Sequence, residues 1–373
     1  MQLETIKTPS LIVDFQRMKR NAERVSNRAK ELNINLRPHV KTHRCLEIAK
    51  LQTEKTFGGI MVSTLAEAQF FSANGFSDII YGVPVERGKF AEAIEIAKRI
   101  EKFAVLTDDA ETVKSLNEAA KNENAKIDVF LKVDVGAHRC GVEPNTAEAF
   151  EIPQIVSDSS NLDFAGILTH AGQSYNANSP EKLLEVAHAE RDLMRNLADE
   201  LRAKGLNVPN VSIGSTPTFS AIDSLEGATE FRCGNYIFFD AFQATLGSCG
   251  FEDCALTVLA AVIHKNVRHK KIVVDAGAVA LSKDRGAVAL DKNCGYGRVY
   301  DLEGNDLNLR VESLSQEHGE ISVSDENVFD KLKVGTRVRI LANHSCLTAL
   351  QHSHYHVLDR GEIVDKWEIN RGW

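Results

Sequence analysis

The segment with the clearest chemical potential is Arg-Pro-His-Val-Lys-Thr-His-Arg at residues 37–44. Apolar and polar residues alternate from residue 34 to residue 41, so we predict a strand here. Its polar face then carries four side chains: Arg37, His39, Lys41 and His43. Burial and neighbouring positive charge both lower the pKa of a lysine, which makes Lys41 a candidate Schiff-base nucleophile. The alternative is a basic strand edge in contact with water.

A second chemical pattern is the tripeptide His344-Ser345-Cys346. In an extended backbone, residues i and i+2 share a face, so His344 and Cys346 can bind one ion while Ser345 points away. An imidazole and a thiolate favour zinc over magnesium or manganese, which prefer oxygen ligands. Two protein ligands leave open positions for substrate and water, as a catalytic metal requires.

A third pattern combines a glycine, two hydroxyl residues and a proline after a short apolar run. Gly214 lets the backbone approach an anion, and the hydroxyl groups of Ser215 and Thr216 can bind phosphate together with free N–H groups. Gly234 and Asn235 are predicted to form the second half of this phosphate cradle. The alternative is that the loop is an ordinary helix N-cap.

Two further polar residues lie at or shortly after the ends of predicted strands. Arg139 lies in a glycine-flanked loop and can hold an oxyanion such as a phenolate without losing its own charge. His170 ends a predicted strand and can pack on a planar cofactor ring or hydrogen-bond to it. The alternatives are a surface-loop arginine and a core histidine with satisfied hydrogen bonds.

The elements that must position these residues alternate between β-branched runs and amphipathic stretches of helical length. Strands are predicted at 34–41, 58–63, 78–83, 102–106, 127–134, 162–170, 210–214 and 229–239. Helices are predicted at 15–32, 65–74, 86–100, 108–122, 145–157 and 180–204. This rhythm predicts a (β/α)8 TIM barrel, in which chemistry lies at the carboxyl ends of the strands. An open doubly wound sheet is the alternative, but no GxGxxG follows the first strand.

The rhythm changes in the last third of the chain. Strand-like segments are predicted at 254–268, 271–275, 308–313, 319–323, 335–341 and 353–358, without a long helical pattern. We therefore expect an α/β protein with a barrel at 14–248 and a mainly antiparallel β domain at 249–373. The opening segment 1–13 is expected to pair with the β domain.

Composition narrows the class of protein. The chain has 373 residues, of which 43% are hydrophobic and 26% charged, which is typical of a soluble protein large enough for two cores. Its net charge of −8 argues against nucleic acid or an anionic membrane as the main partner. No apolar run reaches the roughly 20 residues of a membrane span, and no signal pattern opens the chain. Seven scattered cysteines without a CxxC favour reduced thiols and a cytoplasmic location.

The motifs together resemble the eukaryotic-type D-serine dehydratase and D-threonine aldolase family, which uses pyridoxal 5′-phosphate (PLP). RPHVKTH, DVGxxRCG, THAGxSY, GSTPT, GNYxFxD and NHxC occur in the order of that family and span nearly the whole chain. The resemblance implies the alanine-racemase-like fold, with an N-terminal PLP barrel and a C-terminal β domain. It also implies a homodimer with active sites near the subunit interface.

The resemblance also implies roles for individual residues. Lys41 matches the Schiff-base lysine that acts as acid and base at the α-carbon, and Arg139 matches the arginine near the PLP phenolic oxygen. The other cofactor matches are Gly214, Ser215 and Thr216 at the phosphate, and Ser63, His170, Gln173, Tyr175 and Tyr236 around the ring and substrate. His344 and Cys346 match the metal pair. The second metal ligand is typically aspartate in the aldolases, so Cys346 favours a dehydratase.

The implied activity is a PLP- and zinc-dependent dehydratase acting on a small D-β-hydroxy amino acid, foremost D-serine, which yields pyruvate and ammonia. One alternative is an aldolase acting on D-threonine or D-3-hydroxyaspartate. Others are a D-threo-3-hydroxyaspartate dehydratase and a PLP-binding protein without catalysis. His352, His354 and His356 share a face of a predicted strand and receive no role.

Overall fold

The computed structural model describes residues 2–373, which form two compact units. The barrel unit comprises Arg24–Gly234 and Gly372–Trp373, and the β unit comprises the described residues up to Glu23 together with Asn235–Arg371. Compared with the expected boundaries, residues 14–23 and 235–248 lie in the β unit. Side-chain bonds account for part of this difference, because Asn21 Nδ2 donates to the carbonyl of Asp253 at 2.9 Å.

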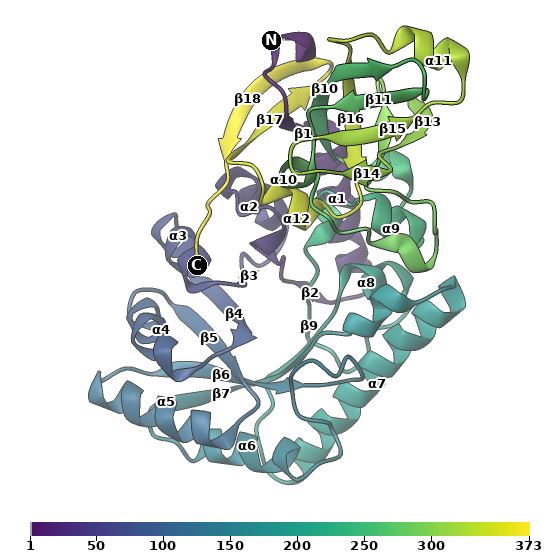
Figure 1. Ribbon diagram of the computed structural model, residues 1–373. Helices are drawn as coiled ribbons and strands as arrows, with labels where there is room; N and C mark the ends of the chain where they lie inside the picture. Colours follow the sequence, from purple (N-terminus) through teal and green to yellow (C-terminus); the bar gives the residue numbers. More distant parts are fainter. Residues whose placement is uncertain (1) are drawn as a thin grey trace. The chain divides into compact units, whose positions relative to one another are not determined.

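Eight parallel strands form the sheet of the barrel unit (Figure 1). They are β2 (Asn35–Leu36), β3 (Ile60–Val62), β4 (Asp78–Pro84), β5 (Lys102–Thr107), β6 (Ile127–Val133), β7 (Leu162–Thr169), β8 (Asn210–Ile213) and β9 (Glu230–Phe231). Their order is β2-β9-β8-β7-β6-β5-β4-β3. The two ends of this order meet through a bridge between His39 and Met61, whose N–H donates to the Pro38 carbonyl at 2.9 Å. The predicted (β/α)8 barrel is confirmed, and the open doubly wound sheet is excluded.

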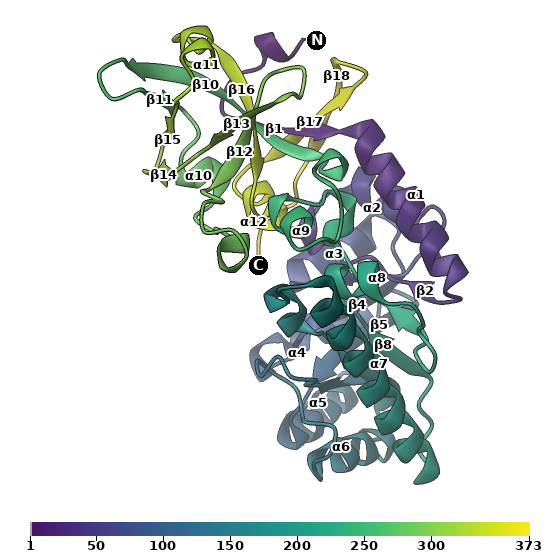
Figure 2. The same cartoon turned by 90° about the vertical axis from the view of Figure 1, so that its right-hand side faces the viewer.

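Helices follow the strands in sequence. They are α1 (Phe15–Glu31), α2 (Leu46–Thr53), α3 (Leu65–Ala73), α4 (Phe90–Ala97), α5 (Ala110–Asn122), α6 (Glu148–Ser157), α7 (Pro180–Ala203) and α8 (Thr216–Ala221). Helices α4, α5 and α6 follow one another along the outside of the sheet (Figures 1 and 2). In residues 2–373, no helix is long and apolar enough to cross a membrane.

The first and last predicted strands of the barrel are much shorter than expected. The strand predicted at 34–41 is limited to Asn35–Leu36, because Pro38 has no N–H for a sheet hydrogen bond, and Val40–Thr42 forms a 3-10 helix. The prediction that Lys41 lies on a strand is therefore wrong, because it lies in this 3-10 helix. Lys41 is exposed, whereas Arg37 and His43 are buried. The strand predicted at 229–239 is limited to Glu230–Phe231.

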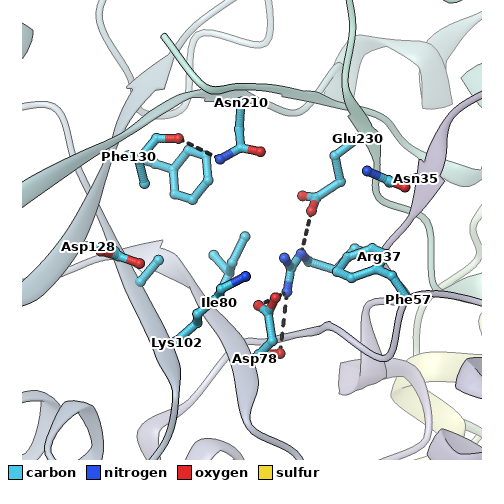
Figure 3. Close-up of a pocket in the computed structure, with 12 residues that line it drawn as sticks. Asn35, Arg37, Phe57, Asp78, Ile80, Lys102, Asp128, Phe130, Asn210 and Glu230 are labelled. Carbon is cyan, nitrogen blue, oxygen red and sulfur yellow. Dashed lines mark hydrogen bonds and ion pairs between the residues drawn. The ribbon is translucent and has the colours of Figure 1, made fainter. Parts of the chain in front are cut away.

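At the amino ends of the strands, Arg37 joins three strands of the barrel (Figure 3). Its Nε donates to Glu230 of β9 at 2.6 Å, and its Nη1 donates to Asp78 of β4 at 2.6 Å and to the Ile60 carbonyl of β3 at 3.3 Å. The Phe57 ring packs on the guanidinium, with 4.9 Å between its centroid and Cζ. This network borders a cavity of about 210 Å³, and residues at this end of a barrel usually serve stability.

We expect Arg37→Met to destabilise the protein by about 3–5 kcal/mol, because the substitution leaves two carboxylates without their buried cation. Urea denaturation followed by circular dichroism measures this change. Arg99→Met is the matched control, since Arg99 pairs with Glu95 on the exposed surface and should cost less than about 1 kcal/mol. Equal losses for the two variants would contradict a special role of Arg37 in closing the barrel.

The β unit is built on a ten-stranded sheet. Its strands are β1 (Ser10–Asp14), β10 (Leu256–Asn266), β11 (Lys271–Val274), β12 (Gly297–Tyr300), β13 (Asp306–Arg310), β14 (Ser313–Leu314), β15 (Gly319–Ser322), β16 (Arg337–Ala342), β17 (His354–Asp359) and β18 (Glu362–Glu368). All pairs are antiparallel except β1 with β17. The mainly antiparallel domain and the pairing of the opening segment are confirmed, whereas β12 and β18 were not predicted.

Short helices connect the strands of the β unit. They are α9 (Ala241–Thr245), α10 (Ala278–Leu281), α11 (Glu326–Lys331) and α12 (Ser345–Ala349). The apolar side chains of β1, β10 and the β17–β18 hairpin form a buried cluster that includes Ile12, Leu259, Leu358 and Ile363. This cluster supports the sheet from which α12 extends.

Candidate functional site

The carboxyl ends of the barrel strands carry most of the predicted cofactor residues. These are Lys41 after β2, Ser63 after β3, Arg139 after β6, His170, Gln173 and Tyr175 after β7, Gly214, Ser215 and Thr216 after β8, and Gly234 after β9. The predicted convergence on one end of the sheet is therefore present. The individual roles of these residues remain predictions.

Contacts around His39 bring the ends of β2, β3 and β9 together. The His39 Nε2 atom lies 3.4 Å from the Ser63 hydroxyl. A Cβ atom at Gly234 would lie 2.3 Å from the His39 carbonyl oxygen, so only glycine fits this position. Ser63 and Gly234 therefore lie beside the segment that carries Lys41.

Contacts around His170 bring the ends of β6, β7 and β8 together. His170 Nδ1 donates to the Gly214 carbonyl at 3.1 Å, and the Tyr175 ring lies 6.2 Å from the imidazole, centroid to centroid. Gln173 Nε2 donates to the Val135 carbonyl at 2.8 Å in the loop that leads to Arg139. The Arg139 side chain is exposed.

The loop after β8 is a helix N-cap, which was the alternative left open by the sequence. The Ser215 hydroxyl accepts from the Thr218 N–H at 3.3 Å, and the Thr218 hydroxyl accepts from the Ser215 N–H at 3.0 Å. The Ser174 hydroxyl lies 3.0 Å from that of Ser215. Gly214 has a φ of +125° and leaves no room for a Cβ, which would lie 2.3 Å from the Phe231 ring. Phosphate binding by this loop stays a prediction.

The strand-end cluster is rich in positive charge. Burial and the neighbouring charge of Lys41 lower the pKa of His39 and lower that of His170 to about 3. Burial and the charge of Arg232 lower the pKa of Lys132 to about 8. Burial also lowers the pKa of Arg232 itself to about 10, despite the opposing charges of Glu230 and Glu190. Such a cluster favours an anionic ligand.

Sequence reasoning missed Lys132 and Arg232. Lys132 is buried near the end of β6, and Arg232 is buried one residue after β9. The Arg232 guanidinium donates from Nη1 to the Ser212 hydroxyl at 2.6 Å and from Nη2 to the Thr169 carbonyl, while its Nε has no hydrogen-bond partner. The signal available in the sequence was a charged residue within an apolar run of strand length. Burying such a charge costs free energy unless an ion pair, a hydrogen bond or a ligand offsets it.

The hydrogen bonds assign opposite tautomers to two histidines. The Nδ1 atom of His170 donates to a carbonyl, whereas that of His43 accepts from the Cys45 N–H at 3.0 Å, so its Nε2 donates to Gln52 at 2.9 Å. Burial lowers the pKa of His43 to about 4. Because both folded-state pKa values lie below the usual 6.5, we expect both rings to stay neutral from pH 8 to about pH 5. ¹⁵N-histidine NMR spectra should show one ring protonated at Nδ1 and the other at Nε2, and two identical tautomers would contradict this assignment.

In the β unit, His344 and Cys346 come together, but not on a strand. Strand β16 ends at Ala342, His344 is the N-cap of α12, and Cys346 lies in the first turn of that helix. The predicted extended geometry is therefore wrong. A contact nevertheless brings the two side chains together, because the Cys346 thiol hydrogen-bonds to the His344 ring. The Ser345 hydroxyl donates to Asp240 at 3.1 Å and accepts from Asn235 Nδ2 at 2.9 Å.

Neighbouring side chains orient this pair. Asp284 accepts from His344 Nδ1 at 2.6 Å, so the other ring nitrogen, Nε2, is the one that faces Cys346, and Asn235 Nδ2 donates to the Cys346 sulfur at 3.6 Å. Burial alone would lower the pKa of His344, but Asp284 and Cys346 together raise it to about 11. Over the described part of the chain, no cluster of three or more His, Cys, Asp or Glu side chains could hold a metal ion. The predicted metal site therefore consists of His344 and Cys346 alone. Tyr236, which was predicted to lie near the cofactor ring, is buried in the β unit.

The chain matches known protein families over nearly its full length. The family described as "Alanine racemase, N-terminal domain" matches residues 13–241, and "Putative serine dehydratase domain" matches residues 255–358. D-threo-3-hydroxyaspartate dehydratase from Delftia sp. is 36% identical, with 100% of this chain and 99% of the relative covered. D-serine dehydratase from Dictyostelium discoideum is 35% identical, with 100% and 98% covered.

A solved structure shows the same architecture. It is a cysteine-to-alanine mutant of D-threo-3-hydroxyaspartate dehydratase in the metal-free form, with a TM-score of 0.97, 35% identity and full coverage of both chains. The two family matches, the full-length relatives and the fold all indicate the same protein family. The chain is a lyase that belongs to the D-serine dehydratase and D-threonine aldolase family, whose members have the alanine-racemase fold.

Proposed function

We propose that the protein is a PLP- and zinc-dependent dehydratase that converts a D-β-hydroxy amino acid, foremost D-serine, to the corresponding keto acid and ammonia. For D-serine the products are pyruvate and ammonia, which balance the substrate because the water lost in elimination is regained on hydrolysis. We further propose that it acts as a cytoplasmic homodimer. The observation that carries this function is the strand-end cluster, in which Lys41 lies among buried cations at the carboxyl ends of the barrel strands.

The residues at the strand ends fit PLP in charge. The phosphate and phenolate of PLP are anionic, and the cluster offers Lys41, Lys132, Arg139 and Arg232. The orphan Arg232 Nε is a buried donor without a partner in the protein, which a bound acceptor group can satisfy. Lys41 is exposed and its amine can therefore be reached by an aldehyde.

PLP, when bound, stabilises the negative charge that develops at the α-carbon of an amino acid. The chain then supplies the proton transfers. In this proposal Lys41 holds the cofactor and takes the α-proton from one face. His170 is neutral because of its low pKa, and with Nδ1 bonded to Gly214 it presents Nε2 as an acceptor. In this proposal the Arg139 guanidinium holds the phenolic oxygen.

Zinc fits the pair in the β unit. His344 Nε2 and the Cys346 sulfur are nitrogen and sulfur donors of the kind zinc prefers, and Asp284 fixes the ring of the first. Zinc, when bound, supplies a Lewis acid that stabilises a departing hydroxyl group. A metal-free relative with a cysteine-to-alanine change supports a cysteine ligand. The presence of cysteine rather than aspartate favours dehydration over aldol cleavage.

A second substrate is supported by the comparisons, since the Delftia relative is a D-threo-3-hydroxyaspartate dehydratase at 36% identity. A panel of D-serine, D-threonine and D-threo-3-hydroxyaspartate, each with its L enantiomer, distinguishes these functions. We expect keto acid and ammonia in equal amounts from the D substrates alone, with the highest kcat/KM for D-serine. Glycine with an aldehyde as the main products would establish an aldolase, and no turnover of any substrate would contradict the proposal.

A further inference from the structure

Helix α7 carries a glutamate, Glu190, within the apolar face that packs on the barrel. Leu183, Ala187, Met194 and Leu197 form this face. The Glu190 side chain is only 1% exposed. A buried glutamate is costly unless its charge and its hydrogen bonds are used, so this residue requires an explanation.

The contacts of Glu190 join two loops of the strand-end cluster. Its Oε1 atom accepts from the Gly214 N–H at 2.9 Å and from the Ala171 N–H at 3.1 Å. Gly214 opens the loop after β8, and Ala171 directly follows His170 after β7. A single carboxylate oxygen of a helix therefore fixes the spacing between these two loops.

Both backbone polar groups of Gly214 have a side-chain partner. The Gly214 N–H donates to Glu190, and the Gly214 carbonyl accepts from His170 Nδ1 at 3.1 Å. Glu190 thus sets the position of the carbonyl that determines the His170 tautomer. It also sets the start of the Ser215-Thr216 segment, whose N–H and hydroxyl groups would have to face a phosphate.

Charge supports the same arrangement. Burial raises the pKa of Glu190, while the two amide hydrogen bonds and the charge of Arg232 act in the opposite direction. Arg232 in turn is buried and contacts Ser212 and Thr169 at the ends of β8 and β7. Burial outweighs these effects, so the pKa of Glu190 is raised overall. Its Oε1 atom has two amide donors, whereas its Oε2 atom is buried without a hydrogen-bond partner.

We propose that Glu190 is a positioning residue that holds the phosphate loop and His170 in register for PLP. It touches neither cofactor nor substrate and acts through the Gly214 and Ala171 amides. This inference rests on the proposed PLP function and extends it to a residue on the outer helix layer. Because the amides need an acceptor rather than a charge, the amide oxygen of glutamine can replace the carboxylate.

The test compares three variants of the holoenzyme with a matched control on the same helix. Glu190→Ala removes the acceptor, Glu190→Asp shortens it by one methylene, and Glu190→Gln retains it. Glu200→Ala is the control, because that glutamate is exposed on α7. The PLP dissociation constant is measured by titration in the visible range, and circular dichroism and thermal unfolding report the fold.

We expect PLP affinity to fall by roughly tenfold or more in Glu190→Ala and Glu190→Asp, since two amide donors lose their acceptor. Glu190→Gln and the control should stay within about threefold of the wild type. If Glu190→Ala does not fold, the contrast between the aspartate and glutamine variants decides. Wild-type affinity in Glu190→Asp, or a glutamine variant as weak as the aspartate variant, would overturn this inference alone. A wild-type protein that fails to bind PLP would overturn the proposed function as well.

Discussion

Replacing Lys41 by alanine is expected to lower kcat by roughly 10⁴-fold or more and to abolish covalent attachment of PLP. The physical reason is that one amine has two tasks in the proposed function, holding the cofactor and carrying the α-proton. No neighbouring base replaces it at once, because the low pKa values of His39 and His170 make both rings weak bases. Visible absorbance, borohydride reduction and peptide mass mapping locate the attachment site.

Lys50→Ala is the control for this experiment. Lys50 is an exposed lysine on α2, nine residues further along the chain, and should leave activity and absorbance unchanged. A Lys41→Ala protein that still fixes PLP on borohydride treatment would show that another lysine is used. Lys132 is then the residue to examine, because burial lowers its pKa to about 8 and makes its amine more available at neutral pH.

The fold could be predicted from the sequence because its signals are local and repeated. Most strands of the barrel are short apolar runs, and the five predicted strands from 58–63 to 162–170 are each followed by a predicted amphipathic helix, so the order of these elements follows from the pattern. The short helices α2 and α8 were not predicted. The lengths of β2 and β9 could not be predicted in this way. Pro38 interrupts the first of these strands, and hydrogen bonds from Asn35 and Arg37 to distant residues decide where it pairs.

The sequence singles out candidate residues where chemistry has a distinctive residue type, as with Lys41, His344 and Cys346, and their roles stay predictions. The site was not predictable where a residue acts through tertiary contacts. Arg37 was placed on the same face as Lys41 by period-two reasoning, but its partners Asp78 and Glu230 hold it at the amino ends of the strands. Glu190 has the pattern of an ordinary helix residue, and only its two hydrogen bonds from backbone amides indicate a role for its side chain.

For His344 and Cys346, the sequence correctly predicted that the two side chains meet, but the predicted extended backbone was wrong. An i, i+2 pair faces one side in a strand, yet His344 and Cys346 meet because the first caps α12 and the second lies in its first turn. The orientation of the imidazole then depends on Asp284, which is 60 residues away in sequence. Such a partner cannot be identified from the tripeptide alone.

Removing zinc is expected to lower dehydration by roughly 10³-fold while leaving the visible spectrum of bound PLP unchanged. The reason is that hydroxide is a poor leaving group, and a Lewis acid on its oxygen contributes several kcal/mol to the transition state. The spectrum should be unchanged because Lys41 and the His344–Cys346 pair are separate sets of ligands, one in each unit. EDTA treatment followed by metal analysis, absorbance and a pyruvate assay measures these effects.

Variants of Cys346 sharpen the same prediction. Cys346→Ala should match the chelated enzyme and lose stoichiometric zinc, whereas Cys346→Asp should bind manganese or magnesium better, because a carboxylate is a harder ligand than a thiolate. The aspartate variant is also assayed for glycine and acetaldehyde from D-threonine, the products of aldol cleavage. Cys249→Ala is the control. This cysteine is half-buried and lies in the same unit, and among the described residues no hydrogen bond joins it to His344. Full D-serine turnover in protein shown to be free of metal would rule out the role assigned to His344 and Cys346.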